Sequence, residues 1–549
     1  MISFFDMLAS MNSSRFYIQS LLSLLTMSYK VVQKQKNGRY YLYEVTGVWD
    51  PVKKNSRQTR KYLGVCDEQG NLLKEPTRNR TISCSPVYGP YQLFVQLAEK
   101  SGLMSALDNV YGKRDGRRLL AMAILGVVDP VTVNQMESVM EDTYLRELLD
   151  VEWEFEQSSV CRFLQTVGHG SEQRELLFRE LAPKSGCVIF DIVCLGTDSE
   201  DLEYSEVGRK THLTGSRQFN LGMVHSMEDH LPFCYRTYPG SVADVSTLDN
   251  IVSDLKTMDC SPIELEMDRG FFSIGNVQMM LERNMGFTVP VPARVNISKL
   301  LLSESVRDID SPLNTDYLAR SVVRGYETFV RLEDDDLVKA SKDDEGAIRA
   351  LVFQDDSRRT KEIATLYSRI GELENRLSGK KYDRFARKKL THKEQQIADL
   401  LEFSEDGDGK TVVTRKRNAI SAKENACGRF AVVTTSKKQW LDLLVQYRLR
   451  NGVEYDFSQL QSDLYVGITG KSDQNSAEGG LLVNFLSLRL RLTLINLLKE
   501  KGLAGNYWVP DVINTLKKLK ISCIGGKWRL NEVTKAQREL FEALEVKIQ

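Results

Sequence analysis

Three acidic residues stand where a metal-dependent site for phosphodiester cleavage would need them. Asp191 ends the apolar run 187–190 within an expected strand, and Asp268 follows the alternating segment 263–267 at the end of another, so both acids are expected on β-strands. Glu454 falls in a stretch with helical spacing. Two divalent cations held by carboxylates can activate a nucleophile and stabilise a leaving oxygen. We therefore predict that Asp191, Asp268 and Glu454 are catalytic ligands of Mg²⁺ or Mn²⁺.

Polar residues around Glu454 share one face of the expected helix. Tyr447, Arg450, Glu454 and Gln461 are offset by 0, 3, 7 and 14 residues. At 3.6 residues per turn, these offsets lie within an arc of roughly 60°. A tyrosine, an arginine and a carboxylate do not form a core stripe, so the face is predicted to meet a ligand. An ordinary i,i+4 ion pair between Arg450 and Glu454 would explain part of the pattern, and both explanations stay open here.

Two neighbouring glutamates are not expected at the metal. Glu264 and Glu266 alternate with apolar residues in 263–267, so they should point away from an apolar face. Asp268 shares their parity but lies at the end of the strand, where ligand sites of α/β sheets gather.

Composition limits the kind of protein. The chain has 549 residues, of which 42% are apolar, enough for a large core and several domains. Its 74 basic and 74 acidic residues cancel, which argues against a uniformly basic DNA-coating protein. Nine cysteines without a CxxC pair and five histidines without ligand spacing indicate a reducing compartment and no zinc site.

Basic residues nevertheless gather in two segments. Residues 28–62 hold nine Lys or Arg against two acids, and residues 378–393 hold seven against one. Local charge matters more than the sum for contact with a polyanion. Each segment could lie along DNA or could be a solvated surface.

The start of the chain shows no sign of membrane insertion. No apolar run approaches the ~20 residues that span a bilayer, so no membrane association is expected. Residues 1–27 lack the basic start and the cleavage site of a signal peptide. They are expected to be a weakly ordered extension.

The hydrophobic period then changes several times along the chain. Residues 28–85 are predicted to be a basic β-rich region with a hairpin turning at Asn37-Gly38 and a third strand near 61–65. Residues 86–183 have helical periods and are a candidate DNA-binding region, with a capped helix start at Ser158.

Residues 184–297 predict an α/β fold with a mixed sheet and flanking helices. The expected order is three strands (187–195, 218–224, 231–238), a helix (241–258), a strand (263–267), a helix (273–284) and a strand (286–291). This is the order of an RNase H-like fold, and its strand–helix–strand units require parallel pairing.

A large insertion is expected at residues 298–440. Its edges are strand-like at 320–332 and 428–435. Its middle is a helix that folds back on 383–403 along a short seam formed by Ile363, Leu366, Ile370, Leu373 and Leu377. Residues 441–505 are predicted to return to the core, and 506–549 to form a tail of a helix, a short basic strand and a final helix.

The spacing of the helical face resembles a known signature. Tyr447, Arg450, Glu454 and Gln461 follow the pattern Tyr-(2)-Arg-(3)-Glu-(6)-X, which resembles the Tyr-Arg-Glu-Lys signature of DDE transposases from bacterial and archaeal insertion sequences. The likeness covers roughly 28–549. The segments that carry it are 219–224, 231–240 and 244–248 after the first aspartate, 268–273 at the second, and 484–488 after the glutamate.

This resemblance implies an RNase H-like catalytic core and cut-and-paste DNA transposition. Water would free a 3′-hydroxyl at the element end, and that hydroxyl would attack target DNA without a covalent protein–DNA intermediate. Asp191 would bridge two metal ions, while Asp268 and Glu454 would each bind one of them. Tyr447 and Arg450 would contact DNA phosphates, and Gln461 stands where the family has its phosphate-binding lysine.

The resemblance also implies the partners. These are double-stranded DNA, both as terminal inverted repeats and as target, and a second copy of the chain in a homodimer assembled on DNA. The expected location is the cytoplasm, at the nucleoid. Two alternatives stay open. One is a transposase-derived DNA-binding protein with lost or reduced cleavage, which the uncharged Gln461 motivates, and the other is a structure-selective nuclease on the same fold.

Overall fold

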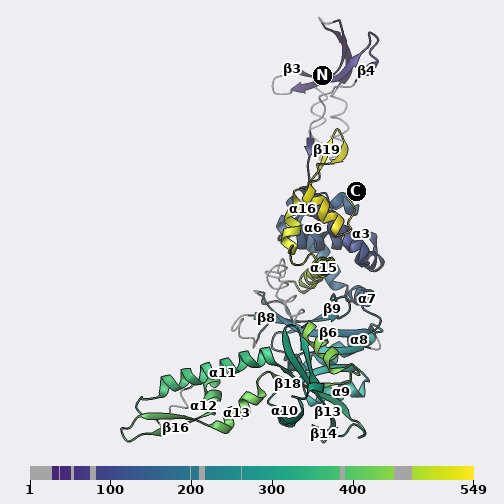
Figure 1. Cartoon of the computed structure of the whole chain (residues 1–549). Coiled ribbons are helices and arrows are strands. Elements are labelled where there is room, and N and C mark those ends of the chain that lie inside the picture. The colour runs from purple at the N-terminus through teal and green to yellow at the C-terminus, as the bar shows by residue number, and fades with distance from the viewer. Residues whose placement is uncertain are drawn as a thin grey trace. The chain divides into compact units, whose positions relative to one another are not determined.

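The computed structural model describes residues 27–35, 38–50, 55–74, 82–197, 199–208, 217–260, 263–383, 390–450 and 473–548 (Figure 1). These residues form two compact units, one from residues 1–86 with Lys520–Glu532 and one from Val87–Leu519 with Val533–Gln549. Glu454 and Gln461 lie outside the described residues, and so does the expected extension apart from Met27, which begins a strand.

The first unit contains a four-stranded antiparallel sheet. Its strands are β1 (Met27–Lys34), β2 (Tyr40–Asp50), β3 (Asn55–Cys66) and β4 (Leu72–Lys74). The predicted hairpin is present, and Gly38 has the positive φ of 78° that its turn requires. The third strand is longer than predicted because it pairs along nearly the whole of β2.

A second, three-stranded sheet in this unit joins distant parts of the chain. It has the order β20 (Lys527–Leu530), β19 (Ile521–Ile524) and β5 (Ile82–Cys84). The single basic strand expected in the tail is therefore wrong. Gly525 and Gly526 both have positive φ, which allows a tight hairpin between two strands.

The second unit begins with a helical region. The helices are α2 (Gly89–Lys100), α3 (Leu103–Val128), α4 (Met136–Glu141), α5 (Leu145–Leu149), α6 (Gln157–His169) and α7 (Ser171–Leu181), with a 3₁₀ turn η1 (Val133–Gln135). The capped start expected at Ser158 is wrong, because α6 begins at Gln157 and no side chain caps it.

Three late helices complete this unit. They are α15 (Gln474–Glu500), α16 (Val509–Lys517) and α17 (Lys535–Ala543). By length and composition α15 could cross a membrane, but 78% of its most apolar stretch is buried inside the fold, where it packs on α3 and α6. At the crossing with α6, a Cβ on Gly168 or Gly479 would overlap the backbone of the other helix. These glycines therefore let the two helices approach closely.

A large mixed sheet forms the centre of the second unit. The successive elements are β6 (Gly186–Gly196), β7 (Glu206–Val207), β8 (Arg217–Ser226), β9 (Pro232–Pro239), η3 (Asp244–Ser246), α8 (Leu248–Thr257), β10 (Ile263–Met267), η4 (Arg269–Phe271), α9 (Ile274–Glu282) and β11 (Gly286–Val291). β6 is parallel to β10 and antiparallel to β8, and β10 is parallel to β11. The strands agree with the predicted ones, but the helix predicted from residue 241 begins at Leu248.

Most strands of the predicted insertion extend this same sheet, whereas β16 and β17 pair only with each other. Its elements are α10 (Asn296–Asp308), η5 (Pro312–Asn314), β12 (Thr315–Leu318), β13 (Ser321–Glu333), β14 (Asp336–Ala340), β15 (Ile348–Asp355), α11 (Asp356–Leu377), α12 (His392–Ala398), β16 (Leu401–Glu405), β17 (Thr411–Arg415), α13 (Arg417–Ala426) and β18 (Arg429–Thr434). The sheet order is β12-β13-β15-β18-β11-β10-β6-β8-β7, and β18 lies antiparallel to β11.

The predicted helical hairpin projects from this sheet as α11 with α12 and α13 (Figure 1). Leu366, Ile370 and Leu373 of α11 are buried against Ile397 and Leu401. The apolar seam is therefore present. Its partners include the strands β16 and β17 and α13 as well as α12.

Candidate active site

Asp191 lies on β6, and Asp268 directly follows the neighbouring parallel strand β10. The register pairs Ile263 with Gly186 and Met267 with Phe190. If this register is continued by one residue, Asp268 lies opposite Asp191 on the same face of the sheet. Neighbouring strands are about 4.8 Å apart, so the two backbones are separated by about that distance. Both side chains are half-buried. The sheet thus brings together two of the three predicted metal ligands.

The helical segment 440–450 places its polar face on Asp268. Arg450 is 5% exposed, and its Nη2 lies 3.4 Å from Asp268 Oδ1. Its guanidinium also lies 5.4 Å from the ring centroid of Tyr447. Burial raises the pKa of the Tyr447 hydroxyl. Both predicted DNA contacts of this segment therefore lie beside the second aspartate, and Arg450 pairs with an acid on the sheet.

The third predicted ligand is not placed. Glu454 and Gln461 lie outside the described residues. Among the residues that the structure does describe, no group of three or more acidic, histidine or cysteine side chains is arranged to hold a metal ion. The donor set of Asp191 and Asp268 consists of carboxylate oxygens, which is the chemistry that Mg²⁺ and Mn²⁺ accept.

A further carboxylate approaches Asp268 from the turn after β9. A Cβ added to Gly270 would lie 3.6 Å from Asp244 Oδ2 and 4.0 Å from Asp268 Oδ2. Asp244 begins the 3₁₀ turn η3 and is half-buried. Sequence reasoning did not select it, because the close approach of η3 and η4 is a tertiary contact.

One helical turn before Arg450, Gln446 makes a second contact with β10. Its side-chain amide donates to Glu266 Oε2 at 3.0 Å and to Cys187 Sγ at 3.1 Å. Lys438 Nζ donates to the amide oxygen of Gln446. Glu266 therefore points away from Leu265 and Met267, as predicted, but into a buried polar cluster rather than solvent.

Glu266 is fully buried, and this burial raises the pKa of its carboxyl to about 8. The neighbouring Glu264 has hydrogen-bond donors on both oxygens, from Thr288 at 3.1 Å and from Ser436 at 3.2 Å. The two glutamates thus bind the helix and the flanking strands together beneath the two aspartates.

The comparisons with known proteins add little to this geometry. No protein-family model and no curated protein matches the chain. Among solved structures, it is similar to a cryo-electron-microscopy structure of a piggyBac transposase synaptic complex with hairpin DNA. The identity is 9%, the TM-score is 0.36, and the likeness covers 80% of this chain and 81% of that one. A TM-score of this size does not establish a shared fold.

Proposed function

We propose that this protein is a DDE transposase of an insertion sequence, which cleaves DNA at the element ends and joins them to target DNA. One observation carries the proposal. The register of the parallel strands β6 and β10 brings Asp191 opposite Asp268, and Arg450 of segment 440–450 forms an ion pair with Asp268. In the sequence Glu454 follows Arg450 by four residues, the spacing that brings two side chains to one face of a helix.

The topology supports an RNase H-like core for this function. The strands β9, β8, β6, β10 and β11 are consecutive neighbours, antiparallel up to β6 and parallel after it. The segments α8 and α9 connect β9 to β10 and β10 to β11. In such α/β sheets ligands bind at the carboxyl ends of the strands, and Asp268 follows the last residue of β10.

The residues present fit a pair of divalent cations. Asp191, Asp268 and Glu454 would hold them, and the bound cations would activate the attacking hydroxyl and stabilise the leaving oxygen. Arg450 pairs with one oxygen of Asp268 through its Nη2, and guanidinium groups are the side chains that bind phosphates most specifically. The ring of Tyr447 supports that guanidinium. These two side chains would orient the scissile strand.

Proposed partners and location follow from the same role. The partners are double-stranded DNA with terminal inverted repeats, target DNA and a second copy of the chain assembled on the DNA. The location is the cytoplasm, in association with the nucleoid. A DNA-binding protein that has lost cleavage is the second candidate, because Gln461 removes a positive charge from the predicted phosphate contacts.

The decisive experiment is a nicking assay with Mg²⁺ or Mn²⁺ on DNA that carries the inverted repeats flanking the gene. The wild-type protein should cut at the repeat ends, and Asp268→Asn should abolish cutting while leaving folding and DNA binding intact. The matched control is Asp259→Asn, since Asp259 is 85% exposed and pairs with Arg179 of α7. Binding without cleavage by the wild-type protein would favour the second candidate.

A further inference from the structure

A cavity beside Asp268 is lined by alternating guanidinium and aromatic groups. Its volume is about 470 Å³. Arg358 from the start of α11, Phe430 from β18, and Tyr447 and Arg450 from segment 440–450 all line it together with Asp268. Arg358 and Phe430 belong to the predicted insertion, and the proposed function so far gives them no role.

These four side chains contact one another in series. The guanidinium of Arg358 lies 5.6 Å from the ring centroid of Phe430. The Phe430 and Tyr447 rings lie 5.3 Å apart, and Arg450 lies 5.4 Å from the Tyr447 ring. Arg450 then reaches Asp268 at 3.4 Å. A continuous stack therefore runs from the insertion to the proposed metal ligand.

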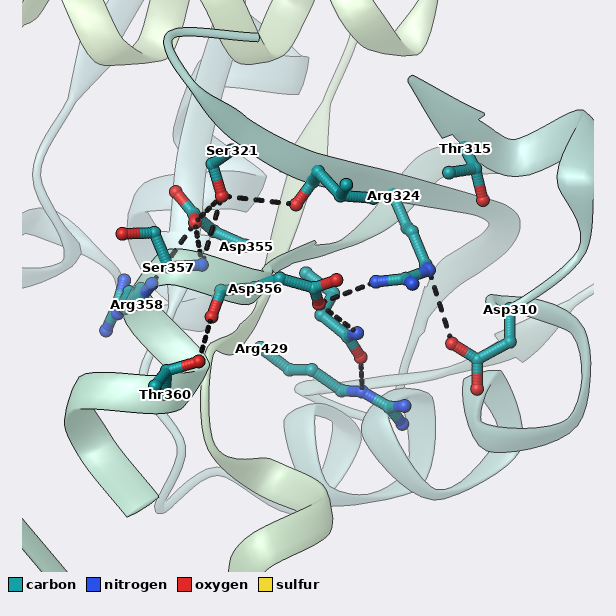
Figure 2. Close-up of polar contacts among 12 residues, drawn as sticks. Asp310, Thr315, Ser321, Arg324, Asp355, Asp356, Ser357, Arg358, Thr360 and Arg429 are labelled. Atoms are coloured by element: carbon teal, nitrogen blue, oxygen red, sulfur yellow. Dashed lines mark hydrogen bonds and ion pairs between the residues drawn. The ribbon is translucent and has the colours of Figure 1, made fainter. Parts of the chain in front are cut away.

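The Nε of Arg358 is held by a hydrogen bond, whereas the rest of its guanidinium is partly exposed to solvent. Its Nε donates to Glu362 Oε1 at 2.7 Å, and Glu362 Oε2 in turn accepts from the Gly428 amide at 2.7 Å. The side chain is 50% exposed, and its Nη atoms form no ion pair among the described residues. In Figure 2 it lies at the left, away from the Arg324–Asp310 ion pair at the right.

The charge of the cavity favours an anion. Asp355, at its edge, is already neutralised by Arg448 at 2.5 Å and accepts hydrogen bonds from Ser321 and the Ser357 amide (Figure 2). The remaining carboxylate, Asp268, is paired with Arg450 and is the proposed cation ligand. The arginines that line the cavity are Arg269, Arg358, Arg429, Arg448 and Arg450.

We propose that Arg358 binds a backbone phosphate of the DNA strand whose scissile phosphate lies at Asp268. A guanidinium that rests on an aromatic ring keeps the N–H groups of its edge free, and this fork matches a phosphate. Proteins that bind single-stranded nucleic acid combine basic side chains, which contact the backbone phosphates, with aromatic side chains, which contact the bases. The assignment rests on the proposed function, and it makes the insertion part of the strand-binding surface.

The test measures binding of the full-length protein to fluorescein-labelled oligothymidine, by anisotropy in EDTA over a series of NaCl concentrations. Arg358→Gln should weaken binding about tenfold at low salt, as expected for one charge-assisted contact. It should also reduce the slope of log K against log salt by about 0.7, the value for one phosphate contact on a single strand. Arg358→Lys should retain the slope but bind more weakly than wild type.

The matched control is Arg331→Gln. Arg331 lies on β13, is 40% exposed and pairs with Glu333 at 3.0 Å, so it resembles Arg358 in exposure and pairing but does not line the cavity. Its substitution should leave the slope unchanged. An unchanged slope in Arg358→Gln, or an equal loss in Arg331→Gln, would overturn the assignment alone. A wild-type protein that binds neither oligothymidine nor duplex DNA carrying the inverted repeats would overturn the proposed function as well.

Discussion

Gln446 and Arg450 lie one helical turn apart, and they contact Glu266 on β10 and Asp268, the residue that follows β10. Gln446 bonds to Glu266 at 3.0 Å, and Arg450 lies 3.4 Å from Asp268. Four residues of a helix rise about 6 Å along its axis, and two residues of a strand rise about 6.6 Å, so the two spacings match. The buried contact of Gln446 therefore sets the rotation of the helix that presents Arg450.

Removing the Gln446 amide should test this contact. Gln446→Ala leaves Glu266 Oε2 and Lys438 without their buried partner, so it should lower the free energy of unfolding by about 1–3 kcal/mol. The measurement is urea denaturation of the metal-free protein. In a double-mutant cycle with Glu266→Gln, the two losses should not add, because the side chains are in direct contact. Additive losses would contradict the contact.

His225 is a second residue whose burial has a measurable effect. It is fully buried on β8, and burial, followed by the charges of Arg489 and His230, lowers the pKa of its imidazole to about 3. The folded state thus binds fewer protons than the unfolded state, in which the pKa is about 6.5. The stability from neutral His225 is complete above pH 6.5 and is lost as the pH falls toward 3.

The corresponding variant is His225→Leu. The wild-type protein should lose about 1.4 kcal/mol of unfolding free energy per pH unit to this group within that window. The variant should show a shallower decline, measured by denaturant titration at a series of pH values. Equal slopes in the two proteins would mean that His225 does not stay neutral in the folded state.

At the scale of elements, segment 440–450 is held by an apolar contact at one end and polar contacts at the other. Leu443 and Leu444 are buried in a cluster with Val323, Leu351, Phe353 and Val432 of the sheet. Trp440 lies against Gly325 of β13, where an added Cβ would overlap the indole. The absence of a side chain at Gly325 therefore decides how closely the start of the helix approaches the sheet.

Gly325→Ala should move this helix. The overlap with Trp440 should cost about 1–3 kcal/mol of unfolding free energy and reduce cleavage, because Tyr447 and Arg450 shift with the segment. Thermal unfolding and the nicking assay measure the two effects. Gly371→Ala in α11 is the control, since its Cβ meets nothing within 4 Å and should stabilise the protein slightly. Adding Trp440→Leu to Gly325→Ala should restore part of the loss.

At the scale of the whole molecule, two strands that are more than four hundred residues apart in the sequence, β5 and β19, pair in one small sheet. β19, near the C-terminus, pairs with β5, and the register places Cys523 opposite Cys84. Residues directly opposite in antiparallel strands have Cα atoms about 4.5–5.5 Å apart, within the range that a disulfide can bridge. Neither cysteine forms a disulfide in the structure.

Mild oxidation should therefore crosslink Cys84 with Cys523. The product closes a loop of most of the chain and should migrate differently from the reduced protein on a non-reducing gel. Peptide mapping should identify the bond, and Cys84→Ser should prevent it. Crosslinking that persists in Cys84→Ser would show that another pair of the nine cysteines reacts and that this register is wrong.

Local patterns in the sequence were sufficient to locate the strands around the candidate site. Alternating and continuous apolar runs marked β6, β8, β9, β10 and β11, because side chains that face a buried surface repeat every two residues or fill both faces. Helical spacing likewise placed Tyr447 and Arg450 on one face. The candidate residues Asp191 and Asp268 were found in this way, as the acids that interrupt or follow buried strands.

Only the tertiary structure decided which of these residues meet. Asp268 lies beside Asp191 because of the register between β6 and β10, and no single turn fixes the register of two strands this far apart in the sequence. The approach of Asp244, the burial of Glu266 and the joining of the insertion strands to the sheet arise from the same long-range pairing. Sequence alone thus determined the period and type of the strands around the site, whereas packing between distant segments determined which residues meet there.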